Sequence, residues 1–322
     1  MAAETVVEAP GPWQHRHVSA NGARFHVVVC DPGTLAAAAG ASDAAAPQAG
    51  SGVRGTVVLL HGFPQLWWSW RAQMRALAEA GWRVVAMDLR GYGGSDKTPE
   101  GYDPHTLADD VAGVIGTLGA GRAVVVGHGW GAYIAWTAAV IHPERVAAVG
   151  SLAATHPNSM LRSLWRHRPK ALRHVVAAQI PWLPERRIRT GSYLRRHLGA
   201  WSSPASGFPT QADIDAYAAS LSQWPSPHCA LEYHRWLGRS RFRADGRAYR
   251  QLMSVPVAQP VLVMLGTDDP ALGPLTSDRT PRFCSGPVRR VAIEQAGHFL
   301  PEERPEAVSE QLLDWLDSLP AG

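Results

Sequence analysis

The stretch Val124-Val125-Val126-Gly127-His128-Gly129-Trp130-Gly131 decides the fold. Three consecutive valines indicate a buried strand, and the apolar run at 132–140 indicates a helix directly after it. Glycines flank the short turn between them because larger side chains would clash there, and the centre of such a turn takes a positive φ. The pattern predicts a nucleophile elbow, whose central residue is normally a catalytic Ser, Cys or Asp. Here that residue is Gly129, which has no side chain to attack a substrate.

The composition indicates a globular chain with a sizeable core. It has 322 residues, of which 46% are hydrophobic, enough for one large domain or two smaller ones. No segment approaches about 18 uninterrupted apolar residues. Residues 1–12 carry acids and prolines where a signal peptide would carry basic and apolar runs. We therefore expect a cytoplasmic protein without a membrane partner.

The cysteines predict neither a disulfide framework nor a metal site. Cys30, Cys229 and Cys284 are an odd number, are widely spaced and form no CxxC motif. We expect no metal and no cofactor.

Charge is segregated along the chain. Residues 155–255 hold 16 Lys and Arg against 5 Asp and Glu, a net +11, whereas the remainder has a net −7. We interpret this as two solvated faces that attract each other, in preference to a site for an anionic ligand or nucleic acid. The expected partner is a small molecule and not a nucleic acid, with a homodimer left open. A solvated helix face is also our interpretation of the arginines at 186, 187, 189, 195 and 196.

Strand and helix patterns alternate on both sides of the elbow. The dipeptide Asn21-Gly22 predicts a hairpin, since it supplies the two positive-φ positions of a tight turn. Alternation of strands and helices implies right-handed crossovers and a mostly parallel sheet covered on both faces. The predicted strands are 15–20, 23–30, 56–60, 83–87, 124–126, 146–152, 261–265 and 288–293, and the predicted core helices include 68–80, 104–118 and 305–319.

Two stretches interrupt this alternation. Residues 31–52 are mostly small or polar, too poor in large apolar groups to fold alone, which predicts a mobile surface insertion. From residue 155 to 256 strand patterns vanish, and prolines separate short helical pieces. We therefore predict an α/β fold whose core, residues 1–154 and 257–322, is split by a helical cap, residues 155–256.

Four motifs resemble the α/β-hydrolase superfamily, and within it the epoxide hydrolases, from about residue 13 to 319. They are His61-Gly62-Phe63-Pro64 with Trp67-Trp68-Ser69-Trp70-Arg71, then Asp88-x-Arg90-Gly91-Tyr92-Gly93-Gly94-Ser95-Asp96, then Gly127-His128-x-Trp130-Gly131, and finally Gly297-His298-Phe299. Their order and spacing match that family. Haloacetate dehalogenases share the scaffold but carry an arginine pair just past the elbow, which this chain lacks. The resemblance implies an α/β-hydrolase fold with a mostly parallel central sheet and an inserted cap.

The resemblance also implies catalytic roles. In epoxide hydrolases an elbow Asp attacks an epoxide carbon to give an ester, and a His held by an acid activates the water that hydrolyses it. His298 matches the base. Asp269 matches the acid, with the adjacent Asp268 as the alternative. The backbone N–H groups of Phe63 and Trp130 match the oxyanion hole.

The chain departs from that family at two places. The nucleophile position falls on Gly129. Family members also protonate the epoxide oxygen with two cap tyrosines, and these positions fall on His174 and His234. The residues that we expect to contribute to substrate binding are His61, Pro64, Trp67, His128, His174, Tyr233 and His234.

Three functions fit these observations. The first is an epoxide hydrolase-like hydrolase of a small, largely apolar molecule, in which His298 and Asp269 activate water beside Gly129 because a covalent Asp mechanism is impossible. The second is a catalytically silent ligand-binding protein on the same scaffold. The third is a non-hydrolytic His/Asp enzyme, such as an isomerase, a lyase or a cofactor-free oxygenase. We place the hydrolase first.

Overall fold

The computed structural model describes residues 6–40, 53–167, 169–272 and 278–320. Within them an 8-stranded sheet has the order β1-β2-β4-β3-β5-β6-β7-β8. The β1–β2 and β2–β4 pairs are antiparallel, and the others are parallel. The predicted mostly parallel sheet is therefore confirmed. The strands are β1 (Gln14–Ala20), β2 (Ala23–Cys30), β3 (Thr56–Leu60), β4 (Arg83–Met87), β5 (Ala123–His128), β6 (Val146–Leu152), β7 (Val261–Gly266) and β8 (Val288–Ile293).

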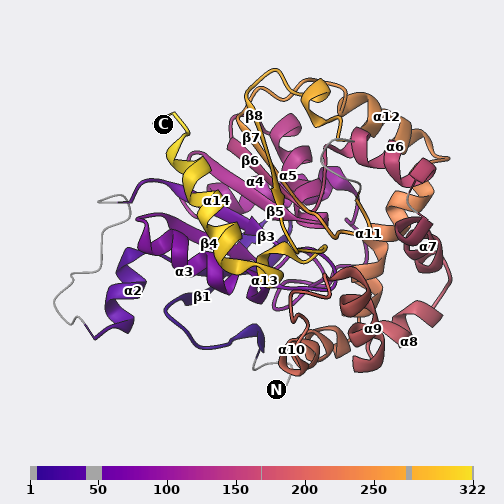
Figure 1. Ribbon diagram of the computed structural model, residues 1–322, viewed down its shortest axis with the longest axis horizontal. Coiled ribbons are helices and arrows are strands. Elements are labelled where there is room, and N and C mark those ends of the chain that lie inside the picture. Colours follow the sequence, from indigo (N-terminus) through magenta and orange to yellow (C-terminus); the bar gives the residue numbers. More distant parts are fainter. Residues whose placement is uncertain (1–5, 41–52, 168, 273–277, 321–322) are drawn as a thin grey trace.

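Helices cover both faces of this sheet (Figure 1). Helix α3 packs against α14, and α4 packs against α5. Helix α5 is apolar around most of its circumference and almost wholly buried, as expected for the helix after an elbow. The core helices are α2 (Pro32–Ala38), α3 (Arg71–Glu79), α4 (Pro104–Thr117), α5 (Trp130–Ile141), α13 (Leu300–Glu303) and α14 (Pro305–Asp317), with 3-10 turns η1 (Trp67–Trp70) and η3 (Thr280–Phe283).

The predicted insertion at 31–52 begins with helix α2, whereas its mobility stays a prediction. Asp31 Oδ1 accepts a hydrogen bond from the Thr34 N–H at 2.9 Å, and Thr34 Oγ1 accepts one from the Asp31 N–H at 2.9 Å. This reciprocal capping box starts the helix, and its alanines favour propagation. Leu35 packs against the core and gives the helix a tertiary anchor. The rest of the predicted insertion, 41–52, lies outside the described residues.

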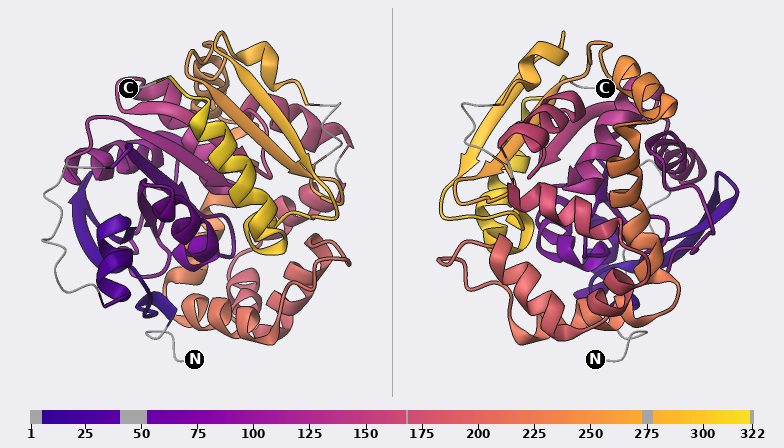
Figure 2. Two further views of the ribbon diagram at one scale, coloured as in Figure 1. Left: turned by 60° about the vertical axis from the view of Figure 1, so that its left-hand side comes forward. Right: turned by 90° about the vertical axis from the view of Figure 1, so that its right-hand side faces the viewer.

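Helices α6 to α12 follow β6 and precede β7, which agrees with a helical insertion at this point of the chain (Figure 2). Among the residues that are described, no helix is both long and apolar enough to cross a bilayer. The helices of the cap are α6 (Pro157–His167), α7 (Pro169–Ala178), α8 (Leu183–Ile188), α9 (Gly191–Trp201), α10 (Gln211–Ser222), α11 (Ser226–Ser240) and α12 (Ala244–Leu252).

Candidate active site

The turn between β5 and α5 has the sharp geometry of an elbow. Gly129 takes φ 53° and ψ −113°. Its N–H donates to the carbonyl of Leu152 at 2.9 Å, which ties the turn to the neighbouring strand β6. A Cβ on Gly131 would lie 2.1 Å from the carbonyl oxygen of Leu60, so position 131 accepts only glycine.

The centre of the turn, in contrast, has free space. A Cβ built on Gly129 would have His298 Nε2 at 3.6 Å and Gly62 Cα at 3.7 Å as its nearest neighbours. Both are ordinary van der Waals distances. A side chain at position 129 would therefore fit sterically and would face the imidazole of His298.

His298 and Asp269 form a hydrogen-bonded pair. His298 Nδ1 lies 2.9 Å from Asp269 Oδ2, while Asp269 Oδ1 accepts from the N–H groups of Ala271 and Leu272 at 2.7 and 3.3 Å. Because the carboxylate can only accept, Nδ1 carries the hydrogen and Nε2 presents a lone pair toward position 129. The alternative acid, Asp268, instead accepts from Ser203 Oγ at 2.5 Å.

A buried carboxylate that the motif comparison missed holds the His298 loop. Glu303 accepts from the N–H groups of Gly297 and Phe299, both at 2.8 Å, and from the N–H of Ser203 at 2.7 Å. It thereby joins the loop on both sides of His298 to the end of α9. Its sequence context, one acid among several at a helix start, gave no signal of this role.

Gly129 and His298 line a cavity of about 110 Å³ between the core and the cap. Gly129, His298, Phe63 and Trp130 contribute from the core. Most of the remaining wall is aliphatic or aromatic, including Met160, Val175, Trp201, Leu237 and Leu272. The cavity therefore suits a small, largely apolar molecule.

Two histidines of the cap, His174 and His234, contact each other in the wall of this cavity. His234 Nδ1 lies 3.3 Å from the carbonyl of Ala230, which only accepts, so Nδ1 carries the hydrogen. His234 Nε2 then accepts from the indole N–H of Trp130 at 3.0 Å. His174 Nε2 lies 3.1 Å from the same nitrogen, so a hydrogen on His174 Nε2 shares that single lone pair with the indole N–H. The ring hydrogen of His234 is thus bound within the protein.

These cap rings are uncharged at neutral pH. Burial, reinforced by the neighbouring imidazole of His298, lowers the pKa of His174 to about 4. Burial likewise holds the pKa of His234 well below its ordinary value, with His174 adding to the effect. A cluster of neutral imidazoles can accept hydrogen bonds, but it is a poor source of protons.

Comparison with known proteins identifies the family. A family model described as the alpha/beta hydrolase fold matches residues 55–305. The chain belongs to this family. It is 35% identical over 294 residues to Epoxide hydrolase A of Mycobacterium tuberculosis, covering 82% of this chain and 90% of that protein. It is 31% identical over 267 residues to the AB hydrolase superfamily protein YfhM of Bacillus subtilis, covering 81% and 89%.

Solved structures agree with this assignment. The crystal structure of Epoxide Hydrolase A from Mycobacterium thermoresistibile matches with a TM-score of 0.77 at 27% identity, covering 96% of this chain and 100% of that chain. An epoxide hydrolase from an endophytic Streptomyces matches with a TM-score of 0.76 at 27% identity, covering 96% and 97%. The α/β-hydrolase fold and epoxide hydrolase-like relatives are thereby established for this chain.

One further residue of this α/β hydrolase lines the cavity and was missed from the sequence. His197 on α9 lies with its ring 5.0 Å from that of His174 and stacks on Tyr193 at 5.7 Å. Burial holds its pKa well below the ordinary value. The signal was its helical spacing, since His197 follows Leu194, which is buried, by three residues and so lies on the same face of the helix.

Five residues predicted to bind substrate lie outside the wall of this cavity, namely His61, Pro64, Trp67, His128 and Tyr233. Several of their polar side-chain atoms are bound to the backbone of the core. His61 Nε2 accepts from the Leu89 N–H at 3.0 Å, and the Trp67 indole donates to the Val7 carbonyl at 2.8 Å. The Tyr233 hydroxyl donates to the carbonyl of Arg90 at 2.7 Å. His128 Nε2 lies 2.6 Å from the carbonyl oxygen of His298, so it positions the base from behind.

Among the described residues, no group of three or more His, Cys, Asp and Glu is placed to hold a metal ion.

Buried histidines should make this hydrolase sensitive to acid. Burial lowers the pKa of His128 and of His156 to about 3, from the ordinary value of 6.5. The unfolded chain therefore binds protons that the folded chain excludes. Stability is fully present above pH 6.5 and is lost as the pH falls toward the folded values, at up to about 1.4 kcal/mol per pH unit for each such histidine.

His156, which lies outside the cavity and stacks on Phe283 at 4.3 Å, tests this effect. His156→Phe should flatten the fall in unfolding free energy as the pH drops below 6.5, as measured by urea denaturation over a pH series. The exposed Phe242, which does not titrate, serves as the control, since Phe242→Leu should leave the pH dependence unchanged. Equal slopes for His156→Phe and wild type would contradict the account.

Proposed function

We propose that this α/β hydrolase cleaves an ester, a lactone or a similar acyl compound with a water molecule activated directly by His298. The observation that supports this most is the open space at Gly129, where a side chain would stand 3.6 Å from His298 Nε2. A water in that space would be within hydrogen-bonding reach of a lone pair that Asp269 keeps oriented. The proton would pass to Nε2 as the water oxygen attacks the acyl carbon.

The N-terminus of α5 suits the charge that such an attack creates. Trp130 is the first residue of α5, so its N–H has no acceptor within the helix. It also stands at the positive end of the helix dipole. With the N–H of Phe63, it would stabilise the oxyanion of a tetrahedral intermediate.

Epoxide opening is supported less well, for two independent reasons. Gly129 supplies no carboxylate for covalent attack. In addition, burial keeps His174 and His234 neutral, and the N–H of a neutral imidazole is far less acidic than the O–H that a cap tyrosine would give to a departing epoxide oxygen. An acyl substrate requires neither group, because its developing charge stays on an oxygen next to the elbow. The relatives named epoxide hydrolases support the hydrolase class and the apolar cavity.

Rapid-quench mass spectrometry with p-nitrophenyl acetate tests the mechanism. We expect p-nitrophenol release without a burst and an intact protein mass that stays unchanged during turnover, since no acyl-enzyme forms. An acetylated protein would contradict direct water attack. Release no faster than in buffer would instead favour the silent ligand-binding function.

A further inference from the structure

Large apolar side chains are exposed where α7 ends and α8 begins. We call Val176, Ile180, Trp182 and Leu183, which are 55, 48, 66 and 37% exposed, the apolar corner. In the described part of the chain seven large hydrophobic residues are exposed, and these four fall within residues 176–183. Such clustering marks an interaction surface, whereas isolated exposed residues do not. Figure 1 shows α7 and α8 at the outer edge of the cap, away from the sheet.

The backbone at the tip of the corner is strained. Trp182 has φ 42°, in the left-handed region that bulky residues rarely adopt. Its carbonyl accepts the N–H of Arg186 at 3.2 Å, which fixes this conformation at the start of α8. A folded chain keeps an exposed tryptophan at such a cost more readily where the residue has a function.

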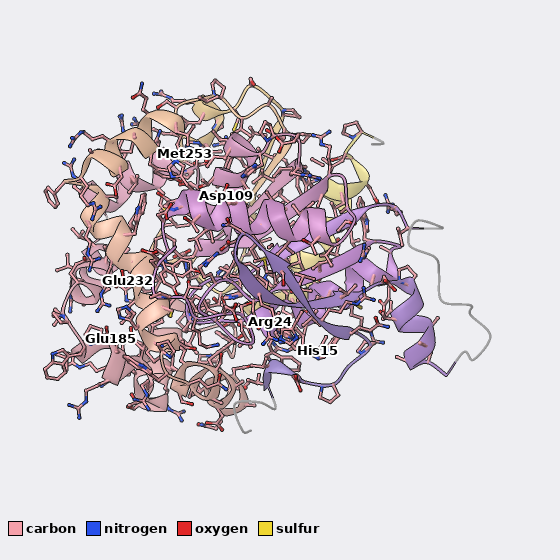
Figure 3. All side chains as sticks on the ribbon, turned by 180° about the vertical axis from the view of Figure 1, so that it is seen from behind. His15, Arg24, Asp109, Glu185, Glu232 and Met253 are labelled. Carbon is pink, nitrogen blue, oxygen red and sulfur yellow. The ribbon has the colours of Figure 1, made fainter. Side chains whose placement is uncertain are left out.

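Positive charge surrounds the apolar corner. Arg173, Arg186, Arg187 and Arg189 are all exposed beside it. The acids of the neighbouring cap are already neutralised, because Arg235 bonds Glu185 at 2.7 Å and Glu232 at 3.1 Å, and Glu185 is buried. Figure 3 shows both acids on the cap. The surface therefore combines apolar side chains with arginines that have no carboxylate partner among the described residues.

A small cavity of about 70 Å³ lies against this surface. Ile180 and Leu183 of the corner, Arg187 and His174 contribute to its lining. His174 also lines the cavity of the active site. His174 therefore borders both the cavity at the corner and the cavity that holds His298.

We propose that the apolar corner docks onto an anionic lipid surface and that the small cavity beneath it admits apolar substrates to the active site. Tryptophan and aliphatic side chains favour the boundary between headgroups and acyl chains, and arginines bind anionic headgroups. Peripheral docking needs no spanning helix, so it replaces the expectation of no membrane partner with a reversible surface contact. The entry route rests on the function proposed above, whereas the docking does not.

Vesicle flotation tests the docking. Wild-type protein should float with vesicles of phosphatidylcholine containing about one third phosphatidylglycerol, float less with phosphatidylcholine alone, and be released by salt. V176S/W182S should lower the bound fraction about tenfold. R186Q/R189Q should remove the preference for phosphatidylglycerol.

Matched controls lie elsewhere on the cap. Phe242 is 80% exposed but outside the corner, so Phe242→Ser should float like wild type, and R243Q/R247Q should keep the lipid preference. Thermal melting verifies that each variant is folded. Flotation of His298→Ala should equal that of wild type, which separates docking from turnover. No flotation of wild type at low salt, or equal flotation of V176S/W182S, would overturn the proposal.

Discussion

Replacement of His298 with alanine is expected to lower the rate of p-nitrophenyl acetate hydrolysis by about 10² to 10⁴-fold, the usual contribution of a general base. The ring supplies the Nε2 lone pair that faces position 129, and a methyl group cannot take up a proton. The KM should change little, because most of the cavity wall is apolar and stays in place. Steady-state kinetics at neutral pH measure both quantities.

Asp269→Asn sharpens this test. An asparagine amide can donate to His298 Nδ1, which would shift the ring hydrogen to Nε2 and remove the lone pair from the cavity. The loss of rate should therefore approach that of His298→Ala while the ring stays in place. His105→Ala, a change at an exposed histidine, is the control and should retain the wild-type rate. Equal hydrolysis by His298→Ala and wild type would exclude the proposed mechanism and favour a binding role.

The core strands are predictable because their burial is nearly uniform. β3 and β5 have sheet neighbours on both sides and helices on both faces, so their sequences are almost continuous runs of valine and leucine. In a strand of this kind both faces are apolar, so the sequence pattern is easy to recognise. The hairpin was equally clear, since Asn21 and Gly22 take φ 45° and 72°, as a tight turn requires.

Helix α2 and the cavity wall were harder to predict for physical reasons. The composition gave no indication of helix α2, because its content of large apolar residues is low. Two local hydrogen bonds at Asp31 start this helix. In the cavity, motif membership identifies the segment but not the direction of each side chain. His61 and His128 belong to the motifs beside the elbow, yet both rings are buried in the core, whereas His197 reaches the cavity from helix α9.

The lining of the cavity also explains why charge predictions did not locate the site. Exposed arginines such as Arg186 and Arg189 lie on the outer surface of the cap, whereas the cap residues that face His298 are neutral imidazoles and apolar side chains. Desolvation keeps those imidazoles uncharged. The chemistry of the site is thus separated from the electrostatics of the surface.

Gly129→Asp is expected to destabilise the protein by about 1 to 3 kcal/mol, the usual cost of a non-glycine residue in a strained backbone region. A Cβ at this position meets no atom closer than 3.6 Å, so the cost comes from φ 53° and ψ −113° and not from a clash. Gly129→Ala carries the same backbone penalty without the charge. Gly121→Ala is the control, because Gly121 has no neighbour within 4 Å and no positive φ, and it should be neutral or slightly stabilising. Urea denaturation measures all three, and an unchanged or raised stability of Gly129→Ala would contradict the strain argument.

Gly129→Asp also tests separately the two features that distinguish this site from that of an epoxide hydrolase, namely the missing elbow carboxylate and the missing proton donor of the cap. Gly129→Asp places a carboxylate beside His298 and should form a covalent ester with styrene oxide, seen as an added mass on the protein. The ester should form slowly, because the N–H groups of His174 and His234, which burial keeps neutral, are weakly acidic. Adding His234→Tyr supplies a phenol at the cap position and should accelerate ester formation by about 10² to 10⁴-fold, as expected for a general acid. If Gly129→Asp alone reacted as fast as the double variant, the cap histidines would be competent proton donors, and the argument from their neutral rings would fail.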